Sequence, residues 1–158
     1  MVEACELSAL DARRQITDGT LTSEKLVQSC LRRSDMHSET VGAWTFIDPE
    51  LALLSAIKSD KAGNPGLLGG LPIGVKDIID TSSMPTTYGS SIYGLNQPKK
   101  DAKCVQNVKE HGGIVLGKTV TTEFAWRNPG KTKNPNNPAH TPGGSSSGSA
   151  AGVADFQM

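Results

Sequence analysis

Two short apolar runs, Leu71-Pro72-Ile73-Gly74-Val75 and Ile114-Val115-Leu116-Gly117, flank a helical segment and decide the fold. Each run is short and bounded by glycine or proline, as is typical of a buried strand. Between the runs, apolar residues recur at helical spacing from Asp101, which is placed to cap a helix, to Gly112-Gly113, which ends it. A strand, a crossover helix and a second strand form a βαβ unit, so we expect a sheet with helices packed on it.

The residues upstream of this unit predict three helices. Ser8 followed by Asp11 resembles a capping box, and Gly19 is placed to end the first helix. Ser23 is placed to cap the second helix, whose apolar residues form one stripe opposite charged residues. Asp48-Pro49 predicts the third start, because proline loses nothing at the first helical position and the aspartate accepts from unpaired N–H groups.

The remaining segments predict one more strand and two long loops. Residues 41–47 mix small, aromatic and β-branched side chains and predict a short strand. Residues 78–98 lack sustained periodicity, and residues 128–142 contain prolines that push the preceding residues out of the helical region. We therefore expect one partial domain, with a mainly helical outer layer over residues 1–62 and the start of an α/β core over residues 63–158.

The charge and length favour a small ligand over a nucleic acid or a membrane. The 158 residues include 16 basic and 16 acidic side chains, which cancel and form no blocks. Such a balance gives no electrostatic footprint for nucleic acid or an anionic membrane. No stretch approaches the roughly twenty apolar residues that span a bilayer, and the start lacks the features of a signal peptide. We expect a cytoplasmic protein that acts on a small molecule.

Cysteine and histidine usage predicts neither a metal ion nor a cofactor. Cys5, Cys30 and Cys104 are far apart, odd in number and unaccompanied by histidines at ligand spacing. They are interpreted as reduced thiols. A zinc site would need a cluster of histidine and cysteine, which this sequence lacks.

The glycine-serine run Gly143-Gly144-Ser145-Ser146-Ser147-Gly148-Ser149-Ala150, taken together with Lys76, predicts acyl-transfer chemistry. An uncharged lysine amine can take the proton that a serine hydroxyl must lose to become a nucleophile. For Lys76 to do so near neutral pH, burial must lower its pKa well below the ordinary lysine value. The alternatives are an ordinary surface lysine and a flexible linker. The proline-rich loop before the run and the alanine-rich segment after it argue against a linker.

Two other patterns suggest different functions. Gly112 to Thr119 matches the phosphate-binding pattern G-x-x-x-x-G-K-T, but its middle residues are the expected strand and the helix precedes the pattern. His140 lies near Ser145 in sequence and suggests a Ser-His-Asp site, but the Gly-x-Ser-x-Gly turn of such sites does not occur. We interpret His37, His111 and His140 as solvated or locally hydrogen-bonded. Neither phosphate binding nor a histidine-based triad is favoured.

The combined motifs resemble those of the amidase signature family. The resemblance is carried by residues 69–77 (Gly-Gly-Leu-Pro-Ile-Gly-Val-Lys-Asp), by Gly117-Lys118-Thr119 with Glu123-Phe124-Ala125, by Asn134-Pro135, and by residues 142–150 (Pro-Gly-Gly-Ser-Ser-Ser-Gly-Ser-Ala). It implies a large α/β domain in which helices pack on a mixed sheet. This chain would supply the amino-terminal part of that domain, with the sheet incomplete.

The resemblance also implies roles for particular residues. It implies a hydrolase that splits a carboxamide into a carboxylic acid and ammonia or an amine through a Ser-cisSer-Lys site and an acyl-enzyme. Lys76 corresponds to the catalytic lysine, and Ser145 corresponds to the bridging serine, whose preceding peptide bond is cis. The residues expected to support the loops or to lie near the acyl pocket are Gly143, Gly144, Ser146, Phe124 and Trp126.

The nucleophilic serine of the family, together with its oxyanion-hole amides, would fall beyond Met158. The resemblance therefore implies no nucleophile in this chain, and we expect a truncated enzyme that is inactive alone. The substrate of the whole enzyme would be a small amide. The alternative is a non-catalytic family remnant that binds a ligand or a partner chain. Exposed sheet edges would favour homo-oligomers or association with another chain.

Overall fold

The computed structural model describes residues 2–158, so Met1, the first residue of the expected helical layer, lies outside the described residues. The described residues form α-helices, strands and short 3-10 helices, the last labelled η. In chain order these are η1 (Ala4–Glu6), α1 (Ala9–Thr17), α2 (Ser23–Met36), β1 (Trp44–Ile47), α3 (Pro49–Lys61), β2 (Pro72–Lys76), η2 (Ser91–Tyr93), α4 (Lys103–Glu110), β3 (Ile114–Thr119), η3 (Glu123–Ala125) and α5 (Ser147–Ala154).

The central strand of the sheet is β3, in the order β1-β3-β2. β2 runs parallel to β3, and β1 runs antiparallel to it. The parallel pair with α4 between its strands confirms the predicted βαβ unit. Every residue of β3 is buried, because strands flank it on both sides and helices cover it.

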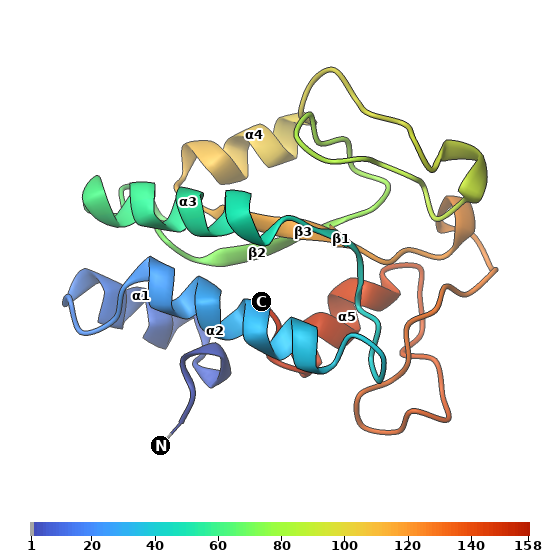
Figure 1. The fold of residues 1–158 in the computed structure, drawn as a ribbon, viewed down its shortest axis with the longest axis horizontal. Coiled ribbons are helices and arrows are strands. Elements are labelled where there is room, and N and C mark those ends of the chain that lie inside the picture. Colours follow the sequence, from blue (N-terminus) through green and yellow to red (C-terminus); the bar gives the residue numbers. More distant parts are fainter. Residues whose placement is uncertain (1) are drawn as a thin grey trace.

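Helices cover the sheet on both sides (Figure 1). α1, α2 and α5 lie on one side and α4 lies on the other, while α3 runs beside β3 and packs against α2. The larger apolar cluster joins α1, α2 and α3 to Trp44, Leu71 and Leu116. A smaller cluster joins Val105 of α4 to Val75 of β2. The expected fold class, α/β with helices packed on a mixed sheet, is confirmed.

Two of the predicted helix starts are confirmed. The Ser8 hydroxyl accepts a hydrogen bond from the Asp11 N–H at 3.1 Å. The Asp48 carboxylate accepts from the Leu51 N–H at 2.9 Å, and Pro49 occupies the first helical position. Both caps are local contacts over three residues, which is why the sequence alone predicts them.

The predicted cap of α2 is wrong by one residue. Thr22 caps this helix, because its hydroxyl accepts from the Lys25 N–H at 3.2 Å. The Ser23 hydroxyl is buried and donates to the Gly70 carbonyl at 2.7 Å. A contact with the segment before β2 therefore uses the side chain that was expected to cap.

The predicted cap of α4 is also wrong. The cap residue is Ala102, whose side chain makes no capping bond. The Asp101 carboxylate instead accepts from the Ser82 N–H at 2.7 Å and pairs with the Lys109 amine at 2.7 Å. These contacts attach the long loop after β2 to α4 and leave no carboxylate oxygen for the helix start.

A β-bulge in β3 decides which side chains face α5. The pairing of β2 with β3 skips Leu116, so this residue is extra and the side chains beyond it exchange faces. Thr119 consequently faces α5, where its hydroxyl lies 2.7 Å from the Ser149 hydroxyl. Lys118 faces the α4 side and the loop after β2.

The remaining predictions on strands and loops hold in their main features. The first strand is shorter than the predicted 41–47, since β1 begins at Trp44. Residues 78–98 form turns and one short 3-10 helix, and residues 128–142 contain a single bridge between Asn134 and Asn137. Within residues 2–158, no helix combines the length and the apolar character needed to cross a membrane.

Candidate active site

Lys76 and Ser145, which are 69 residues apart in sequence, meet at the carboxyl end of β2. The Lys76 Nζ donates to the Ser145 Oγ at 2.6 Å. Lys76 is the last residue of its strand, and Ser145 lies two residues before α5. Both residues are half-buried. The structure therefore places the amine and the hydroxyl in direct contact at a site that solvent still reaches.

The backbone around Ser145 is fastened to the sheet and to the loop that follows it. The Gly144–Ser145 peptide bond is cis, which is the geometry that the resemblance implies. The Ser145 carbonyl accepts from the Thr122 N–H at 3.0 Å. Gly148 leaves no room for a side chain, since a Cβ there would lie 2.1 Å from the Ala43 carbonyl oxygen. The glycine-serine run is a docked segment, and the linker alternative is wrong.

The surroundings of Lys76 favour its neutral form. Burial lowers the pKa of the Lys76 amine below the ordinary lysine value, because desolvation penalises the charged form. Among residues 2–158, no carboxylate forms an ion pair with this amine. The adjacent Asp77 is completely buried and pairs with Lys118 instead. The direction of the shift is the one that a general base requires.

The neighbouring serines have other partners. Ser147 is buried, and its hydroxyl donates to the Val120 carbonyl at 3.3 Å. The Ser149 and Thr119 hydroxyls share one hydrogen bond. These contacts commit the Ser147 and Ser149 hydroxyls to β3 and the residue after it. Ser145 is the serine of the run whose hydroxyl the Lys76 amine contacts.

The aromatic residues that the resemblance implicates are exposed. Phe124 and Trp126 have 51% and 73% of their surface accessible. The Phe124 ring packs edge-on against Tyr93 with centroids 6.1 Å apart, and the Arg127 guanidinium lies 5.4 Å from the Trp126 ring centre. Both rings thus contact residues of the surrounding loops. Also exposed are Gly143, Gly144 and Ser146.

The interpretation of His37 as solvated or locally bonded is wrong. Its Nδ1 lies 2.7 Å from the Asp155 carboxylate, which is 118 residues away and also pairs with Arg33 at 2.9 Å. This contact attaches the end of α5 to α2. His111 does bond locally, with Nδ1 2.8 Å from the Asn107 carbonyl. Across the described residues, no group of three or more His, Cys, Asp or Glu side chains is arranged to hold a metal ion.

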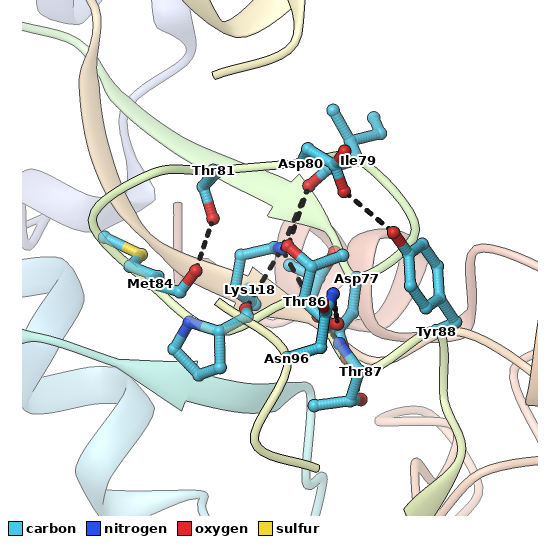
Figure 2. Close-up of polar contacts among 12 residues, drawn as sticks. Asp77, Ile79, Asp80, Thr81, Met84, Thr86, Thr87, Tyr88, Asn96 and Lys118 are labelled. Carbon is cyan, nitrogen blue, oxygen red and sulfur yellow. Dashed lines mark hydrogen bonds and ion pairs between the residues drawn. The ribbon is translucent and has the colours of Figure 1, made fainter. Parts of the chain in front are cut away.

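Sequence analysis missed a second buried lysine beside the site. Lys118 is completely buried, and its Nζ donates to the Thr86 hydroxyl at 2.6 Å and the Ile79 carbonyl at 2.9 Å (Figure 2). The same Nζ lies 3.3 Å from the Asp77 carboxylate. Because protein oxygens occupy this amine, the phosphate-loop pattern has no lysine free for phosphate. The available signal was the charged pair that ends β2 beside Lys118-Thr119 at the same edge of β3.

Solved structures of amidases share this fold. The native peptide amidase from Stenotrophomonas maltophilia is 34% identical with a TM-score of 0.86, over 94% of this chain and 34% of that one. An amidase family protein from Bacillus anthracis str. Ames is 32% identical with a TM-score of 0.88, over 98% of this chain and 34% of that one. The fold therefore defines an α/β protein of the amidase type.

Sequence comparison agrees with the fold. The model of the Amidase family matches residues 25–158. A glutamyl-tRNA(Gln) amidotransferase subunit from Chloroflexus aurantiacus is 33% identical over 168 residues, which cover 100% of this chain and 34% of that protein. The chain belongs to the amidase family, and it spans about a third of the length of the curated relatives it matches. The resemblance stated from the motifs is confirmed.

Proposed function

We propose that this chain provides the lysine–serine proton relay of an enzyme that hydrolyses the carbon–nitrogen bond of small carboxamides. The observation that carries the proposal is the 2.6 Å contact between the Lys76 amine and the Ser145 hydroxyl. It is supported by the direction of the Lys76 pKa, which burial lowers, and by membership of the amidase family. A neutral amine against a serine hydroxyl is a base with its first proton donor already in place.

In the proposed reaction, Ser145 passes protons and remains neutral. Neutral Lys76 takes the proton of the Ser145 hydroxyl, while Ser145 takes the proton of an attacking serine. The attacking oxygen then bonds to the amide carbon. As the tetrahedral intermediate collapses, the proton returns along the same path to the leaving nitrogen, and the carbon–nitrogen bond breaks. Water attacks the resulting acyl-enzyme by the same relay and releases the carboxylic acid.

We place the attacking serine outside residues 2–158. Ser147 and Ser149 bond to β3 and the residue after it, and Ser145 is engaged with Lys76. On this proposal the chain does not turn over amides by itself, because loss of the attacking group removes the covalent route. The amide substrate, the cytoplasmic location and association through the edge strands β1 and β2 stay predictions.

Two measurements test the proposal. The purified chain is incubated with aliphatic and aromatic amides, and ammonia release is followed. We expect none, and turnover that disappears with Lys76→Ala would place the nucleophile inside this chain. In the second, this chain replaces the corresponding first third of the S. maltophilia peptide amidase, and hydrolysis of a peptide amide is measured.

The chimera separates catalysis from mere binding. We expect Lys76→Ala and Ser145→Ala to lower its activity by at least about a hundredfold, the lower end of general acid–base contributions. The exposed Ser146→Ala serves as the matched control and should leave the activity unchanged. An active chimera that tolerates Lys76→Ala would contradict the relay. A folded but inactive chimera that still binds the peptide amide would favour the non-catalytic remnant.

A further inference from the structure

We propose that Lys118 is a positioning residue for Lys76, because it holds the Asp77 carboxylate on the face of the sheet opposite the Lys76 amine. The inference deepens the proposed function, since Lys76 is the base of the relay described above. Lys118 touches neither Ser145 nor Lys76 in the contacts of the site, and it acts through Asp77 alone.

The environment of Lys118 is built to hold a charged amine. Its side chain is completely buried, and four oxygens surround the Nζ (Figure 2). The Thr86 hydroxyl, the Ile79 carbonyl and the Pro85 carbonyl accept at 2.6, 2.9 and 3.2 Å, and the Asp77 carboxylate lies at 3.3 Å. A buried ammonium needs a counter-charge and full hydrogen bonding. Asp77 supplies the counter-charge and the loop supplies the other acceptors.

The Asp77 carboxylate is fixed on that face by contacts from the following loop. One oxygen accepts from the Thr87 N–H at 3.1 Å, and the other accepts from the Thr87 hydroxyl. The Asp77 backbone is also held, because its N–H donates to the Thr119 carbonyl at 3.0 Å and its carbonyl accepts from the Tyr88 N–H at 2.9 Å. The carboxylate is thus oriented by the loop and neutralised by Lys118.

The two lysines lie on opposite faces of one pair of strands. Lys76 points to Ser145, on the α5 side, and Asp77 is the next residue along the chain. Successive side chains of a strand alternate between faces, so Asp77 points to the α4 side. The bulge at Leu116 brings Lys118 to that same side. Each lysine therefore has its own face, and the single carboxylate between them belongs to Lys118.

The charge of Asp77 matters because few other charged groups surround Lys76. α5 contains no acidic or basic residue, and Lys118 is the only charged residue of β3. On α2, Arg33 pairs with Asp155. The other charged side chains of α2 are exposed: Glu24, Lys25, Arg32 and Asp35. An uncompensated carboxylate at Asp77 would consequently be the main charge acting on the Lys76 amine, and it would favour the protonated form.

The test measures the Lys76 pKa directly, by NMR titration of the chain with ¹³C-labelled lysine side chains, the Lys76 signal being assigned with Lys76→Arg. The variants are Lys118→Met, Asp77→Asn and the double variant. Lys118→Met leaves the Asp77 carboxylate uncompensated, so the Lys76 pKa should rise by about one unit or more. The double variant removes both buried charges, and it should return the Lys76 pKa to within about 0.3 units of wild type, because a neutralised pair adds little field.

Each outcome decides. A folded Lys118→Met protein with the wild-type Lys76 pKa overturns the inference, as does a double variant that keeps the raised value, since a purely structural defect would persist in both. If Lys118→Met alone does not fold, the double variant decides: a wild-type Lys76 pKa supports the inference, and a shift beyond about half a unit contradicts it. The titration needs no substrate, so it can succeed even if the chimera shows that the proposed relay is wrong.

Discussion

Lys76 and Thr119 are direct partners across the parallel strands β2 and β3, and each bonds to a serine of the same downstream segment. Lys76 contacts Ser145 at 2.6 Å, and Thr119 contacts Ser149 at 2.7 Å. The segment that carries Ser145 is therefore attached to the sheet at two adjacent points. The second point positions the first, because Ser149 lies one helical turn after Ser145.

Thr119→Val removes the second attachment while nearly preserving the side-chain shape. Thr119 is completely buried, so the lost hydrogen bond should lower the free energy of unfolding by about 1 kcal/mol. Urea unfolding followed by circular dichroism measures this change. Ser146→Ala, on the same segment but exposed, is the control and should stay within about 0.5 kcal/mol of wild type. Equal stability of Thr119→Val and wild type would show that the contact does not hold the segment.

Gly148→Ala tests whether the start of α5 must touch the sheet. The added Cβ would lie 2.1 Å from the Ala43 carbonyl oxygen and 2.3 Å from the Val120 nitrogen, both of them backbone atoms that cannot rotate away. We expect a loss of about 3 kcal/mol or more in unfolding free energy. Gly19→Ala is the control, since its φ is +75° but its surroundings are open, and it should cost about 1 kcal/mol. Equal costs for the two variants would argue against the close approach.

Sequence reasoning succeeded where a structural signal is local. The caps at Ser8 and Asp48 depend on a side chain and an N–H three residues away, and both are visible in the chain order. The βαβ unit is visible because two apolar runs bracket a helical period. The motifs around Lys76 and Ser145 indicated the family, and the comparisons confirmed it.

The failures share one physical cause, which is competition from distant partners. Ser23 and Asp101 have the right chemistry for caps, but Gly70 and Lys109 use their side chains. Nothing near Asp155 in sequence predicts that α2 would hold it. The bulge at Leu116 depends on how two strands pair, so simple alternation would have assigned Lys118 to the wrong face.

The cysteines should differ sharply in reactivity. Burial raises the pKa of Cys30 to about 12, with a smaller contribution from the nearby Cys5, whereas Cys104 is exposed. Because the thiolate is the reactive form, an aromatic disulfide reagent at about pH 8 should modify Cys104 quickly and the buried pair only on unfolding. Absorbance of the released thiol reports the count. Cys104→Ser should abolish the fast phase, and a second fast thiol in that variant would contradict the burial of Cys5 and Cys30.

The pH dependence of stability reports on Lys76 without any substrate. Burial lowers the pKa of its amine from the ordinary value of 10.5, so in the window between the lowered pKa and that value the unfolded chain binds more protons at this site than the folded chain. The free energy of unfolding rises with pH wherever the unfolded state binds more protons. The penalty for burying the charged amine is therefore full below the lowered pKa and disappears as the pH rises to the ordinary value.

Lys76→Met should flatten this rise, since it removes the titrating group and keeps the apolar stem. Urea unfolding at a series of alkaline pH values measures the difference between wild type and variant, which should grow in favour of wild type as the pH increases. The effect will be modest because Lys76 is half-buried and solvent screens its charge. Ser146→Ala, which changes a neutral exposed residue of the same site, should run parallel to wild type. Parallel curves for Lys76→Met as well would mean that the folded chain does not disfavour the charged amine, and the relay would then lack its base.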